Sequence, residues 1–167
     1  MQGFYQKHTA LCKLLLRIVI LAAVVWAILT FILGFHYIRG NYMYPAVRDG
    51  DLCITYKLEQ NIQNDIVEYV SPEGKKKLGR LIGLPGDVID ITEAGIMTIN
   101  GYQPSEEIFY PTSIENAKTK FPYTVPDDSY FILNDFRSDI EDSRIYEAIP
   151  KGSIKGKIIF VIRRRGF

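Results

Sequence analysis

The side chains in this sequence that could support nucleophilic chemistry are those with a hydroxyl or an amine group. No serine precedes Ser71, so the hydroxyls before that position belong to threonine and tyrosine. Tyr42 lies in a Gly- and Pro-containing segment, but a phenol with a pKa near 10 is a poor nucleophile unless a base takes its proton. Lys77, in the basic run Lys75–Lys77, is the candidate base. A lysine acts as a base only where burial lowers its pKa from about 10.4 toward neutrality.

A second group of chemically capable residues is a set of carboxylates near the C-terminal third: Asp135, Asp139, Glu141 and Asp142. Carboxylates this dense can bind Ca²⁺, but their spacing does not match a calcium-binding loop. With only two cysteines there is no Cys/His cluster either. The sequence therefore favours a solvated turn here, with no metal and no cofactor.

Three longer motifs surround these residues. The first is Gly40-Asn41-Tyr42-Met43-Tyr44-Pro45 followed by Asp49-Gly50-Asp51, the second is Gly79–Asp87 (GRLIGLPGD), and the third is Asn134–Arg144 (NDFRSDIEDSR). They resemble the signature boxes of the type I signal peptidases, membrane-anchored Ser/Lys proteases that cut signal peptides from exported proteins. The family boxes read Gly-x-Ser-Met-x-Pro, Lys-Arg-x-x-Gly-x-Pro-Gly-Asp and Gly-Asp-Asn-Arg-x-x-Ser-x-Asp-Ser-Arg. Shorter matches keep the same register: Asn64–Val67, Ile99–Gly101 and Val125–Phe131.

The departures from these boxes are selective. Tyr42 stands at the position of the nucleophilic serine, Gly79 at that of the lysine base, and Ile140 at that of the third-box serine. The resemblance thus implies a degenerate member that has lost its catalytic dyad. It also implies a retained frame or groove, made of Met43, Pro45, Asp51, Arg80, Pro85, Asp87, Asp135, Arg137, Asp142, Ser143 and Arg144.

Other residues are poorly placed to replace the lost groups. Cys53 and Thr55 belong to a strand that follows the turn, and Cys53 reads as a small buried hydrophobic residue. Lys77 precedes Gly79 by two positions and shares its strand face, but lies about 6.6 Å away. The charged run around Lys77 favours a hairpin tip. We therefore expect the serine endopeptidase chemistry of the family to be absent.

Asp142 and Arg144 resemble an ion pair that braces the site in the family. Their simpler interpretation is a surface pair worth at most about 1 kcal/mol. The matching spacing favours the bracing role.

These elements follow an apolar segment. Residues 18–35 carry no charge, enough at about 1.5 Å per residue to cross a hydrocarbon core of roughly 30 Å. Residues 1–17 contain three Lys or Arg and no acid, which predicts a cytoplasmic N-terminus. The sequence after the segment lacks a small-x-small cleavage pattern, which favours an uncleaved anchor over a signal peptide. We therefore expect a cytoplasmic tail (1–17), a single transmembrane anchor (18–37) and an extracellular domain (38–167).

The pattern beyond the anchor is that of a mainly β domain. Short alternating or apolar runs are separated by Gly, Pro and Asn/Asp clusters, which predicts an antiparallel barrel or sandwich. The resemblance implies that this domain has the signal-peptidase-like form. The Asn-Gly pair after Ile96–Ile99 predicts a tight hairpin turn, and residues 104–126 read as a surface excursion. The expected strands are Asp51–Tyr56, Ile66–Val70, Leu78–Ile82, Val88–Ile91, Ile96–Ile99, Tyr130–Leu133 and Ile154–Ile162.

The net charge of +1 provides no field for nucleic-acid binding. The resemblance implies a cell-membrane protein, and the small outer domain looks like the Gram-positive branch of the family. There, degenerate signal-peptidase-like proteins are encoded with pilus genes and assist the polymerisation of pilin by a sortase. We therefore expect an inactive chaperone or scaffold for exported polypeptides. The alternatives are an active signal peptidase with an unusual nucleophile, and a subunit that positions an active peptidase or sortase.

Overall fold

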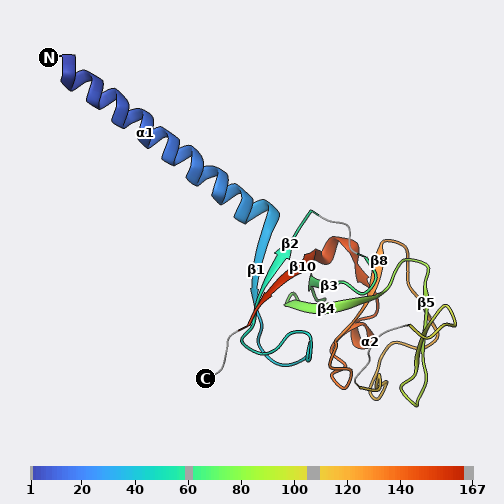
Figure 1. The fold of residues 1–167 in the computed structure, drawn as a ribbon. Helices are drawn as coiled ribbons and strands as arrows, with labels where there is room; N and C mark the ends of the chain where they lie inside the picture. Colours follow the sequence, from blue (N-terminus) through green and yellow to red (C-terminus); the bar gives the residue numbers. More distant parts are fainter. Residues whose placement is uncertain (1, 59–61, 105–109, 164–167) are drawn as a thin grey trace.

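The computed structural model describes residues 2–58, 62–104 and 110–163, with side chains from Lys13 onward. An N-terminal helix, α1 (Gln2–Ala27), continues through a π-helical turn, η1 (Ile28–Ile32). It projects away from the rest of the chain as a single rod (Figure 1). The segment Lys13–Ile32 has a mean hydropathy of 2.7 and none of it is buried, so it is long and apolar enough to cross a membrane.

The predicted anchor boundary needs a correction. The helix ends at Ile32, and strand β1 (Leu33–Tyr37) begins at once. β1 pairs in an antiparallel register with β2 (Leu52–Tyr56), with Phe35 opposite Ile54. Residues 33–37 therefore belong to the β domain, although the expected anchor extended to residue 37. The apolar character of the run hid the change because a half-buried strand is apolar too.

The β domain that follows the helix is built on antiparallel strands, as predicted. A seven-stranded sheet has the order β1-β2-β10-β3-β4-β8-β9, and a smaller sheet has the order β6-β5-β7. Figure 1 shows the large sheet curling, with β5 at the end of the domain farthest from the helix. The further strands are β3 (Ile66–Val70), β4 (Lys76–Gly83), β5 (Val88–Ile91), β6 (Met97–Ile99), β7 (Tyr123–Thr124), β8 (Ser129–Leu133), β9 (Ile149–Pro150) and β10 (Ile154–Ile162). A short helix, α2 (Ser143–Tyr146), and a 3₁₀ turn, η2 (Lys151–Ser153), complete the fold.

β4 is the strand that positions the site. Its first half pairs only with β3, in a register that places Lys77 opposite Tyr69 and Gly79 opposite Val67. Pairing with β8 begins at Arg80. The first half of β4 therefore has one edge that no strand covers in the described part of the chain.

The polar stretch 104–126 is only partly a surface excursion. Its residues 105–109 lie outside the described residues. Its C-terminal part returns to the domain, where β7 pairs with β5 and Phe121 and Tyr123 pack against Phe131. The Asn-Gly turn forms as predicted, because Asn100 and Gly101 have φ angles of 53° and 83°.

Candidate functional site

The loop between β1 and β2 presents Tyr42. Side-chain oxygens hold this loop, because Gly40 N donates to Asp49 Oδ1 at 2.6 Å and Asp49 N donates to Asn41 Oδ1 at 3.1 Å. Asp51 closes the loop by accepting from Arg48 N at 3.0 Å. Met43 is buried in a cluster with Ile38, Val47, Cys53 and Leu78. The loop is thus a packed turn that fixes the direction of the residue at the nucleophile position.

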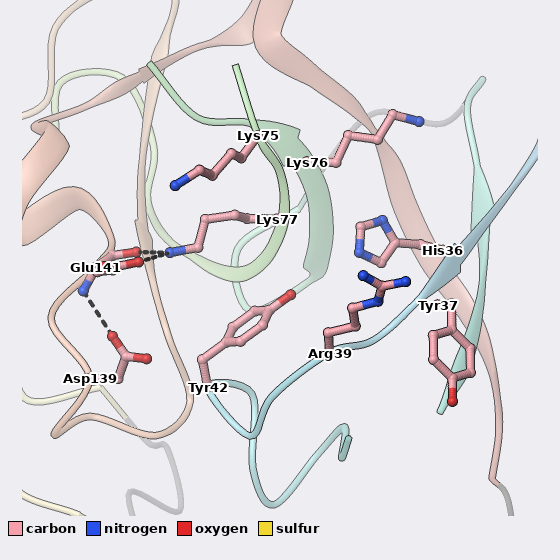
Figure 2. Close-up of a pocket in the computed structure, with 9 residues that line it drawn as sticks. All are labelled: His36, Tyr37, Arg39, Tyr42, Lys75, Lys76, Lys77, Asp139 and Glu141. Atoms are coloured by element: carbon pink, nitrogen blue, oxygen red, sulfur yellow. Dashed lines mark hydrogen bonds and ion pairs between the residues drawn. The ribbon is translucent and has the colours of Figure 1, made fainter. Parts of the chain in front are cut away.

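The Tyr42 ring points from this loop toward β4 and fills the space between them (Figure 2). The ring packs against the cluster that contains Leu78. Burial raises the pKa of the Tyr42 hydroxyl, and the hydrogen bond with the Leu78 backbone only partly offsets this. A hydroxyl with a raised pKa is harder to ionise than a free phenol, so Tyr42 is a weaker nucleophile here than in water.

Lys77 lies above Tyr42. Its ammonium donates to the Glu141 carbonyl oxygen at 2.5 Å and lies 3.3 Å from Glu141 Oε2. It also lies 5.6 Å from the ring centroid of Tyr42 and 5.7 Å from that of Tyr146, within cation–π range. The side chain is 11% exposed, which corrects its expected placement at a charged hairpin tip. Because Lys77 is on β4, its side chain shares the strand face of Gly79 and points into the site.

Gly79 is buried, and its surroundings leave no space for a side chain. A Cβ built there would overlap Ile132 Cγ2, and it would lie 3.2 Å from Tyr69 Cε1 and 3.4 Å from the Leu133 carbonyl oxygen. Ile132 and Tyr69 are both fully buried. Ile132 and Tyr69 therefore occupy the space into which a side chain at position 79 would point.

A pocket of about 390 Å³ opens beside Tyr42. Its walls come from β1 and the following loop, from the β3–β4 hairpin and from the loop before α2 (Figure 2). We call it the cationic pocket, because four of its side chains are Lys or Arg and two are Asp or Glu. The lining residues are His36, Tyr37, Arg39, Tyr42, Lys75, Lys76, Lys77, Asp139 and Glu141.

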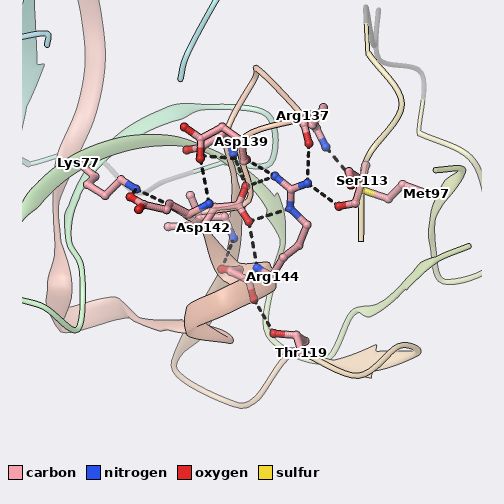
Figure 3. Close-up of polar contacts among 12 residues, drawn as sticks. Lys77, Met97, Ser113, Thr119, Arg137, Asp139, Asp142 and Arg144 are labelled. Carbon is pink, nitrogen blue, oxygen red and sulfur yellow. Dashed lines mark hydrogen bonds and ion pairs between the residues drawn. The ribbon is translucent and has the colours of Figure 1, made fainter. Parts of the chain in front are cut away.

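Behind this pocket, Asp142 and Arg144 form an ion pair that is completely buried. Arg144 Nε donates to Asp142 Oδ1 at 2.9 Å and Nη2 to Oδ2 at 2.6 Å. The guanidinium also donates to the carbonyl oxygens of Ser113, Arg137 and Asp139 (Figure 3). The surface-pair interpretation is therefore wrong. The pair ties several loop segments together, which fits a bracing role.

The third motif is also tied to the other two. Phe136 N donates to the Tyr42 carbonyl oxygen at 3.0 Å. Arg80 holds Asp135 through two contacts of 2.6 Å and donates to the Asn64 carbonyl oxygen at 2.7 Å. Tyr42 thus sits between two segments whose relative position is fixed by a bidentate ion pair.

The other predicted positions lie around this site rather than in the pocket. Asp87 caps the turn that contains Pro85, accepting from Leu84 N and from Asn100 Nδ2, both at 2.8 Å. Ser143 Oγ accepts from Ile132 N at 2.9 Å and so holds the strand that fills position 79. Pro45 and Ile140 are half-buried in their loops, and Arg137 is buried with Nη1 3.8 Å from Met97 Sδ.

Sequence reasoning missed one polar cluster beside the pocket. Glu68 is 3% exposed, accepts from Thr55 Oγ1 at 2.8 Å and lies 3.3 Å from His36 Nδ1. Lys76 Nζ is 3.5 Å away. Burial opposes ionisation of Glu68, but the hydrogen bonds from His36 and Thr55 and the nearby positive charges outweigh it and lower its pKa to about 2. A glutamate inside the apolar run Ile66–Val70 was the sequence feature that could have predicted a buried polar cluster.

The clustered carboxylates of the third motif have protein partners. Asp135 binds Arg80, Glu141 binds Lys77 and Asp142 binds Arg144. Across residues 13–58, 62–104 and 110–163, no three His, Cys, Asp or Glu side chains converge as metal ligands would. Cys53 is not poised for chemistry either, because burial and the nearby Asp51 and Glu68 carboxylates raise its pKa to about 11.

Known proteins match this chain along most of its length. Signal peptidase IB of Staphylococcus aureus is 27% identical over 172 aligned positions, which cover 89% of each chain. A probable signal peptidase I-2 of Synechocystis is 29% identical, covering 87% of this chain and 68% of its own length. The crystal structure of a signal peptidase I from Enterococcus faecalis superposes with a TM-score of 0.51 at 27% identity, covering 59% of this chain and 97% of the other. The model of the signal peptidase family, peptidase S26, matches residues 11–163, so this chain belongs to that family.

Proposed function

We propose that this chain is a signal-peptidase-like membrane protein without peptidase activity that binds exported polypeptides as a chaperone or scaffold. The observation that carries the proposal is the packing at position 79. The family places its general base there, whereas this chain has a glycine whose missing side chain is replaced by Ile132 and Tyr69. Loss of a catalytic unit of this kind costs on the order of 10⁶ in rate.

The alternative, an active peptidase, is favoured by the relatives, which are named signal peptidases. In this chain such an enzyme would need Tyr42 as nucleophile and Lys77 as base. A base must lie within hydrogen-bond reach of the proton it removes. The Lys77 ammonium instead bonds to Glu141 and lies over the face of the Tyr42 ring. That geometry supports the inactive assignment.

A binding role is supported by what remains. The loop of Tyr42, the second motif and the third motif are held together by the Phe136–Tyr42 hydrogen bond and the Arg80–Asp135 pair. The pocket beside Tyr42 is open to a ligand. The first half of β4 has an edge that is not covered by β8, and such edges accept extended peptides.

The client that we propose is an exported polypeptide such as a pilin subunit, in sortase-dependent pilus assembly at a Gram-positive cell surface. This part of the proposal rests on the resemblance of the degenerate motifs, with Tyr42 and Gly79 at the dyad positions. We place the N-terminus in the cytoplasm and the β domain outside, because the basic residues precede the anchor.

A cleavage assay tests the loss of activity. The full-length chain in detergent is incubated with a signal-peptide substrate, and we expect cleavage at the level of the buffer control. The Staphylococcus aureus enzyme serves as positive control. Cleavage that disappeared in Tyr42→Ala or Lys77→Ala would contradict the proposal.

A second set of variants tests the packing at position 79. The double variant Tyr42→Ser/Gly79→Lys forces a side chain into space that Ile132 fills, so we expect its free energy of unfolding to fall by about 1–3 kcal/mol. Adding Ile132→Ala to this variant makes room, and we expect part of that loss to be regained. An equally stable double variant would show that Ile132 does not block the position.

Client binding is tested by photo-crosslinking in native membranes, with a photoreactive residue in place of Tyr37 at the exposed rim of the cationic pocket. Mass spectrometry identifies the product. We expect a pilin or another exported polypeptide. A sortase or an active peptidase as sole partner would favour the positioning-subunit alternative, and no product at all would contradict the proposed function.

A further inference from the structure

We propose that the cationic pocket binds an acidic segment of the client, with a carboxylate held between Arg39 on one wall and Lys75 and Lys76 on the other. This inference rests on the proposed function, because it names the chemistry of the client that the same site would take. It is carried by the distribution of charge in the pocket and by the way in which the pocket carboxylates are already used.

The two acidic side chains that line the pocket already have hydrogen-bond partners in the protein. Glu141 accepts from Lys77, and Asp139 Oδ1 accepts from Glu141 N at 3.0 Å. Lys77 and Glu141 therefore cancel each other's charge within the pocket. Asp139 keeps its negative charge, while Arg39, Lys75 and Lys76 contribute three positive charges at the rim.

The rim cations are available to a ligand. Arg39 is exposed, and no Asp or Glu of the described residues forms an ion pair with it. Lys75 and Lys76 have side chains 73% and 64% exposed, and each pairs with one glutamate of the β3–β4 hairpin, Glu73 at 2.8 Å and Glu68 at 3.5 Å. Ion pairs of such exposed lysines contribute little, so an incoming carboxylate can share their ammonium groups.

The arrangement of these side chains suits an extended segment. Figure 2 shows Arg39 and His36 on the side of β1, Lys75 and Lys76 on the side of the β3–β4 hairpin, and the Tyr42 ring beside Arg39 and below Lys77. The volume of about 390 Å³ is within the range of sites for small ligands, so it accommodates a short stretch of chain rather than a folded domain.

The position of Tyr42 indicates why charge would carry the recognition. The Tyr42 hydroxyl faces the Leu78 backbone at the uncovered edge of β4. A peptide added as a strand would have to compete with this hydroxyl for the same backbone group. Carboxylate contacts at the rim need no such displacement.

The test uses the full-length chain in nanodiscs of uncharged phosphatidylcholine. The probes are a short fluorescent peptide of alternating Ala and Glu and its Ala/Gln counterpart, and the dissociation constants come from fluorescence anisotropy at low and high salt. We expect the Ala/Glu peptide to bind, binding to weaken with salt, and the Ala/Gln peptide to bind at least about tenfold more weakly.

The pocket variant is Arg39→Gln/Lys75→Gln, which removes two exposed charges and leaves the Glu68 cluster intact. Its control, Lys120→Gln/Lys155→Gln, makes the same change of net charge at exposed positions that do not line the pocket. We expect the pocket variant to bind the Ala/Glu peptide on the order of tenfold more weakly, and the control to stay within about twofold of the wild type.

Equal binding of both peptides, or equal weakening in both variants, would overturn the inference. So would a chain that ignores the peptides but binds vesicles of phosphatidylglycerol through Arg39 and Lys75, since the site would then take a lipid headgroup. The crosslink from position 37 distinguishes failure of acidic recognition from failure of client binding. If the pocket variant still captures the client as the wild type does, acidic recognition fails while client binding stands.

Discussion

At the scale of single residues, Gly79 has no free space where a side chain would lie. Ile132 and Tyr69 occupy the volume, and Ser143 Oγ holds Ile132 through its backbone amide. Tyr42 similarly fills the gap toward β4. Tyr42 and Gly79 are therefore both matched by the packing of their neighbours, and we expect Ser and Lys introduced at these positions alone to conflict with that packing.

Tyr69 carries a cost that can be measured. Its hydroxyl is buried and has no hydrogen-bond partner among the described residues, and burial together with nearby Asp142 raises its pKa. An unpaired buried hydroxyl is unfavourable, so we expect Tyr69→Phe to raise the free energy of unfolding by about 1 kcal/mol. Chemical denaturation in detergent measures it. Tyr123→Phe is the matched control, because the Tyr123 hydroxyl accepts from Ala148 N at 3.3 Å and its removal should destabilise.

At the scale of elements, the Glu68 cluster links three strands of the large sheet beside the cationic pocket. His36 is on β1, Thr55 on β2 and Glu68 on β3. Glu68 is thus the buried carboxylate that His36 and Thr55 contact from the other two strands. These neighbours stabilise its ionised form.

The pH dependence of stability follows from this pKa. The folded state lowers the pKa of Glu68 from 4.5 to about 2, so its contribution is fully present above pH 4.5 and is lost as the pH falls toward 2. We expect Glu68→Gln to lower the free energy of unfolding by about 3 kcal/mol at neutral pH, and the difference from wild type to shrink below pH 4.5. The control is Glu115→Gln, an exposed carboxylate. A difference that stayed constant down to pH 2 would show that the charge of Glu68 is not involved.

The elements could be predicted from sequence to different degrees. Short apolar or alternating runs located β2, β3, β5, β8 and β10. Burial alternates along β2 and β5, whereas β3 and β8 each bury three consecutive residues. It could not place the end of the helix at Ile32, since strand β1 continues the apolar run. β7 and β9 are two residues long, too short to show a period.

The site, too, could be predicted only in part from the sequence. The motifs located Tyr42, Gly79 and the Asp142–Arg144 pair, because motif spacing is local information. The position of Lys77 over the Tyr42 ring was missed, since its neighbours Lys75 and Lys76 are exposed and the run looked like a solvated tip. The contact of His36 with Glu68 joins residues 32 positions apart on β1 and β3, which β2 and β10 separate in the strand order, so it depends on the curling of the sheet.

At the scale of the whole molecule, the helix leads directly into the large sheet, and one face of that sheet is apolar like the helix. The helix enters the sheet directly through β1, and β2 and β10 lie beside it (Figure 1). The register places Phe35, Ile54 and Phe160 in one row across these strands, and Tyr37, Leu52 and Ile162 in the next. The partners on the opposite face, such as Cys53 and Val161, pack in the core. The outward face is therefore apolar next to the apolar helix.

An exposed apolar face of this kind is unfavourable in water but suited to the boundary of a bilayer, where aromatic side chains are common. Phe35 is 52% exposed and Phe160 63%. If α1 crosses the membrane, the short connection to β1 holds these side chains near the lipid headgroups. The domain would then rest on the membrane through the β1–β2–β10 face, with the small sheet of β5, β6 and β7 farther out.

Tryptophan fluorescence in bilayers tests this orientation. Trp26 is the single tryptophan, so Phe160→Trp in a Trp26→Phe background reports on the outward face. We expect lipids brominated near the headgroup to quench the introduced indole, because its side chain would reach the interface. Tyr102→Trp in the same background is the control, since Tyr102 is 80% exposed and follows β6 in the small sheet. Equal quenching in both variants, or none in Phe160→Trp, would mean that the domain does not rest on this face and that the helix alone holds it at the membrane.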